Sequence, residues 1–264
     1  MPRRIVNAWA LAIYLTSLLA LSFSVPQQVM AKSTKEGLPN GRIGGGTRES
    51  LPDRRIGEGT REGLPGRRIG GGTRGCSLDP KNLVALMPDN NFGLTKEAHP
   101  NFFFYLPKTS EKTMVEFVLQ DDKSNLLSET TFMTSNSTGV VNVSLPNSGS
   151  FPSLAVGKKY HWYLSIICEE DNRANDIFVD GWIERIELAP ELAKKLEHSS
   201  PTERAVLYAS NGLWYDALTT LAELLDTYPN DSRFTASWKQ LLQSVSLDTI
   251  AQEPLLKRKV YNQN

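Results

Sequence analysis

The chain has 264 residues, of which 40% are hydrophobic and 22% are charged, an ordinary composition for a globular protein of one or two domains. Its 29 Lys and Arg residues balance 29 Asp and Glu residues, so the formal net charge is zero. This balance excludes a dedicated nucleic-acid coat protein and argues against DNA as a partner, because such binding needs a strongly basic surface.

The N-terminal segment has the pattern of an export signal. Arg3 and Arg4 precede an apolar run without acidic residues over 5–24, and residues 29–31 read Val-Met-Ala, a small-residue cleavage site. The pattern predicts a signal peptide over 1–31 and a secreted, periplasmic or envelope location. An uncleaved membrane anchor is the alternative, since the run is nearly long enough to span about 30 Å of hydrocarbon.

Three tandem units of 13 residues follow, EGLPNGRIGGGTR over 36–48, ESLPDRRIGEGTR over 49–61 and EGLPGRRIGGGTR over 62–74. Leu and Ile are the main apolar anchors of a unit, too few to offset about 1–2 kcal/mol of backbone entropy per residue. We therefore expect a disordered Gly- and Arg-rich arm over 32–75. Its eight arginines leave polyanion binding open, and a solvated linker is the alternative.

The chain has two cysteines, Cys76 and Cys168. In an oxidising compartment a lone pair of cysteines is more often a disulfide than two free thiols. We expect the disulfide, and two buried unpaired thiols are the alternative.

From 76 to 189, short β-branched and aromatic runs stand between turn residues, with no long helical period. This pattern predicts an antiparallel β-sandwich domain of the immunoglobulin or fibronectin III type. Alternation along 160–168 places Tyr160 and Trp162 on the core face and His161 on the opposite face. The expected strands cover 82–87, 101–106, 113–120, 126–132, 140–145, 160–168 and 177–188.

The segment 154–160, Leu-Ala-Val-Gly-Lys-Lys-Tyr, is followed by Trp162 and resembles the tyrosine corner of immunoglobulin-like and fibronectin type III-like sandwiches. The resemblance implies that the Tyr160 hydroxyl bonds back to the backbone while its ring packs inward. Tyr160 and Trp162 are then structural residues rather than a platform for stacking sugars.

An acidic stretch, EEDNRAND over 169–176, lies between two expected strands. The carboxylates of Glu169, Asp171 and Asp176 could form a weak Ca²⁺-binding loop. A plain hairpin loop, in which Arg173 neutralises a neighbour, is the favoured alternative, because cation sites rarely contain an arginine.

After residue 189 the period becomes helical up to 256, ahead of a short tail over 257–264. We expect helices over 190–198, 201–211, 213–228 and 232–244, which makes the chain a segregated α+β protein. One stretch resembles a single tetratricopeptide repeat, and we expect this helical hairpin to pack on the sandwich rather than to form a peptide groove. The resemblance rests on Tyr208, Gly212, Trp214, Ala217, Leu221 and Pro229.

Neither catalytic motifs nor metal-ligand spacings are found in the sequence, and the three histidines are scattered. We therefore expect no catalytic, cofactor-binding or metal-binding residues, although a triad scattered across the fold stays open. A cleft around exposed aromatics would support an enzyme instead. Its candidate residues are Glu169, Asp171, Asp176, Glu184 and His161.

Residues 69–256 resemble a family of exported cyanobacterial proteins grouped only as a domain of unknown function. The resemblance is carried by the Gly-Gly-Gly-Thr-Arg-Gly-Cys run ending at Cys76, and by segments 83–88, 99–107, 167–168, 181–183 and 213–218. The family has a single repeat copy before the domain, so the copies over 36–61 are additional. The resemblance implies no activity and no cofactor.

We expect a non-enzymatic protein–protein interaction module of the cell envelope or extracellular space, whose protein partner is unknown. A carbohydrate-active or peptide-cleaving envelope enzyme is one alternative, and polyanion or polysaccharide binding through the repeats is another. A membrane would be contacted only through an uncleaved signal segment.

Overall fold

The computed structural model describes residues 66–71, 76, 78, 82–109, 112–134, 137–145 and 153–256. The expected signal peptide, the first two repeat units and the C-terminal tail lie outside the described residues. Within the described part of the chain, no helix is long and apolar enough to cross a bilayer.

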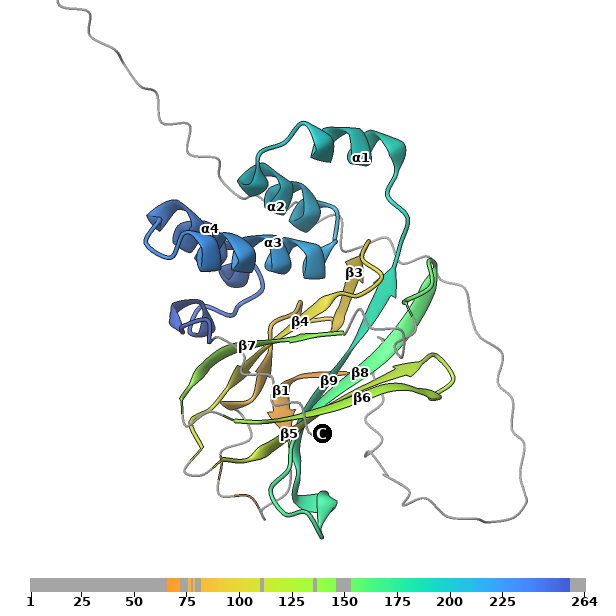
Figure 1. Cartoon of the computed structure of the whole chain (residues 1–264), viewed down its shortest axis with the longest axis vertical. Helices are drawn as coiled ribbons and strands as arrows, with labels where there is room; N and C mark the ends of the chain where they lie inside the picture. The colour runs from red at the N-terminus through yellow and green to blue at the C-terminus, as the bar shows by residue number, and fades with distance from the viewer. Residues whose placement is uncertain are drawn as a thin grey trace, which may run out of the picture.

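The described strands form one sheet in the order β6-β5-β8-β9-β1-β2-β4-β7, with β3 paired to β9 (Figure 1). All neighbours are antiparallel except β3 and β9, which are parallel. An antiparallel sheet with helices is therefore confirmed, whereas a two-sheet sandwich is not, because β1 and β2 connect the two halves into one curled sheet. The bounds are β1 Arg67–Gly71, β2 Val84–Ala85, β3 Phe92–Thr95, β4 Asn101–Leu106, β5 Met114–Asp121, β6 Leu126–Met133, β7 Gly139–Ser144, β8 Lys158–Ile166 and β9 Ile177–Arg185.

The third repeat unit corrects the expectation of a disordered arm up to residue 75. Its residues Arg67–Gly71 form β1, in which Ile69 lies opposite Val84 of β2 and Arg67 lies opposite Asp180 of β9. The unit cannot build a core of its own, but its backbone groups gain partners from β2, which is near in sequence, and from β9, which is far along the chain. The folded part therefore includes residues before Cys76.

The concave face of the sheet carries the hydrophobic core. Trp162 is 1% exposed and contacts the rings of Phe102 and Phe104, with ring centroids 6.0 and 5.4 Å apart. Tyr160 and Leu164 on the same face of β8 are also buried, so the alternation predicted for this strand is confirmed.

The Tyr160 hydroxyl accepts a hydrogen bond of 2.7 Å from the Ala155 amide, five residues upstream. This is the contact that the tyrosine-corner resemblance implies, although the fibronectin-like fold itself is not confirmed. The bond fixes the entry into β8 and so sets which faces its side chains occupy.

Four helices follow β9 within the described residues and gather at one end of the sheet (Figure 1). Ser200 caps α2 in a capping box with Glu203, and Asp231 caps α4 by accepting a hydrogen bond from the Arg233 amide. The bounds are α1 Pro190–Glu197, α2 Pro201–Ser210, α3 Trp214–Thr227 and α4 Ser232–Gln243, followed by the 3-10 turn η4 over Ile250–Gln252.

The first turn of α3 fastens the helices to the sheet. Trp214 Nε1 donates a hydrogen bond of 2.8 Å to the Leu86 carbonyl, and the Lys96 amide donates one of 3.2 Å to Asp216. Tyr215, between them, packs on Gly93 of β3, where an added Cβ would come within 2.7 Å of its ring. The expected packing of the helices on the sheet is present, but a tetratricopeptide-like hairpin is not confirmed.

Candidate binding site on the outer face of the sheet

The convex face of the sheet carries a group of polar and aromatic side chains at the centre of β8 and β9. The strand register places His161 opposite Trp182 and Tyr163 opposite Asp180. Side chains directly opposite each other on one face of an antiparallel pair are in contact range. The four residues therefore form one group on the side away from the core.

Asp180, His161 and Tyr163 form a continuous hydrogen-bond chain. The Asp180 carboxylate lies 2.8 Å from His161 Nε2, and the Tyr163 hydroxyl lies 2.8 Å from His161 Nδ1. Because a carboxylate only accepts, a neutral His161 carries its proton on Nε2, and Nδ1 accepts the bond from Tyr163. Asp180 is 8% exposed, so this donor offsets the desolvation of its charge.

The rings in this group form a band across three strands. The imidazole of His161 stacks on the Trp182 indole with centroids 4.3 Å apart and planes 9° apart, and the Tyr163 ring lies 4.3 Å from the imidazole on β8. Phe92 of β3 lies beside Trp182 in the parallel pair. Phe92, Tyr163 and Trp182 each remain partly exposed.

Two cations lie at the ends of this band. The Arg67 guanidinium lies over the Phe178 ring at 5.1 Å, and the Lys159 ammonium lies over the Phe92 ring at 5.6 Å and 4.0 Å from Glu184. Such cation–π contacts keep charged groups next to apolar surface. We call the whole set the outer-face cluster, namely Arg67, Phe92, Lys159, His161, Tyr163, Phe178, Asp180, Trp182 and Glu184.

Both ring nitrogens of His161 have hydrogen-bond partners, so Asp180 and Tyr163 hold the imidazole in a fixed position within the outer-face cluster. Partly exposed aromatic rings flanked by cations are the surface chemistry that is enriched at protein interfaces.

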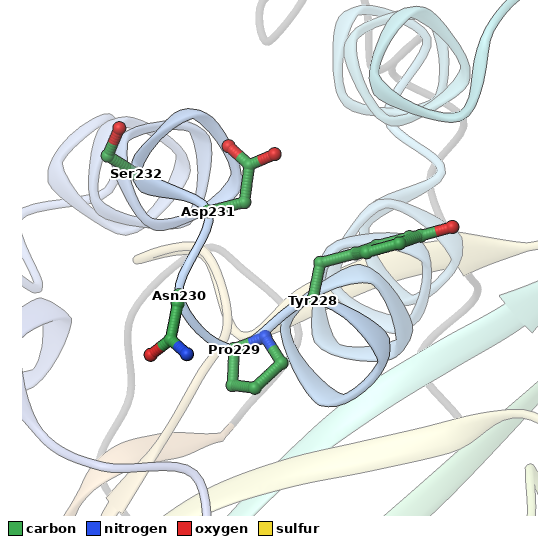
Figure 2. A pocket seen from close by; sticks show the side chains of 5 residues that line it. All are labelled: Tyr228, Pro229, Asn230, Asp231 and Ser232. Atoms are coloured by element: carbon green, nitrogen blue, oxygen red, sulfur yellow. The ribbon is translucent and has the colours of Figure 1, made fainter.

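A surface hollow in the described part of the chain lies away from this cluster, at the turn between α3 and α4 (Figure 2). Its lining residues run consecutively from Tyr228 to Ser232, so it brings together no distant parts of the fold. Tyr228 is 54% exposed and its ring lies 5.6 Å from that of Phe234. The hollow is an open turn, and we do not assign it a ligand.

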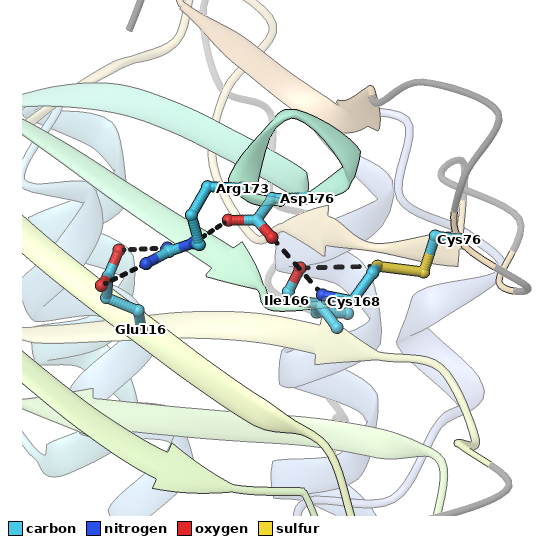
Figure 3. Close-up of polar contacts among 6 residues, drawn as sticks. All are labelled: Cys76, Glu116, Ile166, Cys168, Arg173 and Asp176. Carbon is cyan, nitrogen blue, oxygen red and sulfur yellow. Dashed lines mark hydrogen bonds and ion pairs between the residues drawn. A yellow bond between two sulfur atoms is a disulfide. The ribbon is translucent and has the colours of Figure 1, made fainter. Parts of the chain in front are cut away.

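The acidic loop is organised around Arg173 (Figure 3). The Arg173 guanidinium contacts Asp176 at 2.6 Å and Glu116 of β5 at 2.9 Å. These contacts, led by the hydrogen bonds to Glu116, raise the pKa of Arg173 above its usual range. Among the described residues, no group of three His, Cys, Asp or Glu side chains could hold a metal ion. The structure therefore does not bring Asp176 together with Glu169 and Asp171, both of which are exposed.

The disulfide between Cys76 and Cys168 is present, with Cα atoms 5.5 Å apart (Figure 3). The Cys168 amide also donates a 3.4 Å bond to Asp176, so the bridge and the Arg173 contacts lie side by side at the end of β8. The bridge expected from the cysteine count is confirmed.

A second group of charged residues lies where α3 meets β3. Burial raises the pKa of the Asp216 carboxyl to about 6, against the attraction of the Lys96 ammonium. Lys96 also pairs with Glu97 and lies over the Tyr208 ring at 5.8 Å. This group lies in the joint between helices and sheet, and its chemistry bears on stability rather than on ligand binding.

Sequence reasoning placed His161 on the outer face but missed Tyr163, Asp180 and Trp182. The alternation of apolar and polar residues from Tyr160 onward, and along 177–188, predicts which face of the sheet each side chain occupies. It cannot show that β8 and β9 pair so that Asp180 reaches His161. Of the residues named for an enzyme site, His161 and Glu184 belong to the cluster, whereas Glu169, Asp171 and Asp176 lie in the loop beyond the end of β8.

The fold and the cluster define an α+β protein in which a curled sheet exposes an aromatic and cationic outer face and is joined to helices at one end. The chain belongs to the DUF928 family, a domain of unknown function, whose profile matches residues 69–255. No curated protein matches the chain.

Proposed function

We propose that this protein is a non-enzymatic protein-binding module of the cell envelope or extracellular space, and that it binds through the outer-face cluster. The observation that carries the proposal is the band of partly exposed rings of Phe92, Trp182 and Tyr163. Aromatic residues and arginine dominate the energetics of protein interfaces, because they bury large areas at small entropic cost.

The support for an extracytoplasmic location is twofold. The disulfide between Cys76 and Cys168 is of the kind that persists in oxidising compartments. The expected signal peptide over 1–31 supplies a route to such a compartment.

The charges of the cluster indicate the chemistry of the partner. Arg67 is exposed, whereas the Asp180 carboxylate is buried against His161. The accessible charge at the Phe178 end is thus positive, and a partner segment with apolar side chains followed by a carboxylate would complement it. Contacts of this kind weaken with rising salt concentration.

The experiment compares capture from envelope extracts by the full mature chain and by two variants. Trp182→Ala removes the central ring of the band, and Tyr228→Ala removes an exposed ring outside it, at 54% exposure. We expect one or more proteins captured by wild type and by Tyr228→Ala to be lost with Trp182→Ala. Identical capture by all three proteins would refute the outer-face cluster as the binding site.

A further inference from the structure

The strand β1 lies between β9 and β2 in the sheet. We call this the β1 slot, the space between β9 and β2 that Arg67–Gly71 fills. The Gly70 amide donates a 2.7 Å bond to the Leu83 carbonyl, and the pairing with β9 and β2 uses backbone groups. Ile69 stays 47% exposed, so burial of its side chain contributes little to holding the strand.

Arg68 is the side chain that fixes the strand in the β1 slot. Its guanidinium lies 3.1 Å from the Met87 carbonyl, 2.8 Å from the Asp89 carboxylate and 2.7 Å from the Val245 carbonyl beyond α4. These acceptors come from the sheet and from the helical region, and the Arg68 side chain is 13% exposed. The β1 slot therefore selects an Arg followed by residues that fit a backbone ladder.

The same Arg-Ile-Gly sequence occurs in all three repeat units. Arg42-Ile43-Gly44 and Arg55-Ile56-Gly57 correspond to Arg68-Ile69-Gly70. The second unit also has Arg54 where the third has Arg67, over the Phe178 ring, whereas the first unit has a glycine there. The second unit is thus the better match of the two additional copies.

Gly66 distinguishes the third unit from the others. A Cβ at this position would lie 2.7 Å from the Cβ of Asn91, so the segment around Asn91 would have to shift. The second unit has Asp53 at the corresponding position. At the position of Gly71 the second unit has Glu58. A side chain there would clash only with the flexible end of an arginine side chain, and this arginine can move aside and pair with the Glu58 carboxylate. At the position of Gly66 the third unit therefore fits the β1 slot better than the second unit does.

We propose that the β1 slot is an exchangeable strand-binding site, and that the second repeat unit of the same chain, residues 49–61, replaces the third unit in it. Cys76 stays fixed to Cys168 in both states. The connection to Cys76 has four residues when Gly71 is docked and 17 when Glu58 is docked. Loop closure alone then favours the third unit by only about ninefold, because the probability of closing a loop falls as the 3/2 power of its length.

The covalent connection also determines the source of the replacing strand. A unit tethered to Cys76 has a high effective concentration at the β1 slot, which a unit from another molecule lacks at ordinary dilution. Exchange replaces the third repeat unit in the β1 slot by the second, and it releases Arg67 and Arg68 from their contacts. Arg67 would leave its position over the Phe178 ring in the outer-face cluster, and Arg54 would take its place there.

The test places a photoreactive side chain beside the β1 slot in the full mature chain, as Phe178→p-benzoylphenylalanine, and identifies the crosslinked unit. Cleavage after glutamate followed by mass spectrometry separates the three units, since cuts at Glu49, Glu58 and Glu62 place them in different fragments. With the natural repeats, we expect the third unit to take at least about nine-tenths of the crosslinks.

Two variants shift the balance in predicted directions. Asp53→Gly gives the second unit the glycine that the β1 slot requires, and its share should rise to about a tenth. Adding Gly66→Asp should make the second unit the main crosslinked copy. Ser50→Gly, a matched change outside the strand segment, should leave the distribution unchanged.

Crosslinks confined to the third unit in Asp53→Gly and in the double variant, with an unchanged circular dichroism spectrum, would overturn the proposal. If the double variant does not fold, Asp53→Gly alone decides the matter. Mixed ¹⁵N-labelled and unlabelled chains show the source of the strand. Crosslinks between two chains would mean that a second copy fills the β1 slot, and would overturn exchange within one chain.

Discussion

Trp162 on β8 and Tyr215 on α3 are joined by a hydrogen bond of 2.8 Å from the indole Nε1 to the phenol oxygen, across 53 residues of sequence. Tyr215 in turn donates a 3.2 Å bond to the Trp182 carbonyl on β9. The phenol is fully enclosed, and this burial raises the pKa of Tyr215 far above its usual range. One side chain therefore links the core, the outer-face strand and the helices into a single network.

Tyr215→Phe should destabilise the protein by about 1–3 kcal/mol, because it leaves the buried Trp162 Nε1 without an acceptor. Urea unfolding followed by tryptophan fluorescence measures the change. Tyr228→Phe removes a hydroxyl from an exposed ring and is the matched control. Equal stabilities of the two variants would contradict the role assigned to Tyr215.

The Asp216 carboxyl should make stability depend on pH between about 4 and 6. Burial raises its pKa to about 6, above the ordinary value of 3.8, so the folded state binds more protons than the unfolded state in this range. The contribution of Asp216 to the free energy of unfolding therefore falls as pH rises through this range. The nearby Lys96 and Glu97 act on Asp216 with opposite signs and remain in any variant at this position.

Asp216→Asn tests this dependence, since its amide oxygen can still accept the bond from Lys96. Relative to wild type, the variant should gain stability between about pH 4.5 and pH 7, by an amount on the order of 1–2 kcal/mol. Denaturant midpoints at the two pH values measure the gain. A constant difference between the two proteins would contradict the raised pKa.

Cys76→Ser and Cys168→Ser should destabilise the protein equally, by at most roughly 4–5 kcal/mol, because each opens the same long loop. The two cysteines are 92 residues apart in sequence. Thiol titration of denatured, unreduced wild type should find no free thiol. Two titratable thiols per chain would eliminate the bridge.

The acidic loop should respond to substitution at Asp176 but not at Asp171. Asp176 is buried against Arg173 and the Cys168 amide, so Asp176→Ala should lower stability by about 1–3 kcal/mol. Asp171 is exposed, and Asp171→Ala should change stability by less than about 0.5 kcal/mol. Calorimetry with and without Ca²⁺ tests the other interpretation of the loop. If Ca²⁺ raises the melting temperature of wild type, and this increase is absent in both variants, the loop is a cation site.

Local patterns in the sequence predicted much of the fold, because their causes are local. Alternation placed Trp162 inward and His161 outward, and the helical period after residue 189 predicted the four helices of the described residues. The missing parts depend on distant partners. β1 has too few apolar residues to be recognised alone, since its stability comes from the strands beside it and from the contacts of Arg68.

The candidate site was only partly predictable for the same reason. The sequence shows that His161 and Trp182 each lie on an alternating strand, but their stacking depends on the register between β8 and β9. The joint of the helices depends likewise on Gly93, whose missing side chain makes room for Tyr215. Neither relationship has a signature within a short window of residues.

The position of β9 in the sheet has a consequence for the order of folding. This strand, the last of those described, pairs with β8, with β1 and with β3, so the first and the last described strands meet in one pair. A chain that emerges N-terminus first, from a ribosome or through a membrane pore, cannot pair β1 with β9 until Asp180 has appeared, and cannot complete the pairing of β3 until Arg185 has appeared. Pairing over such separations is slow, so the incomplete sheet exposes strand edges throughout that interval. Completion of β9 therefore covers the strand edges that β1, β3 and β8 present until then.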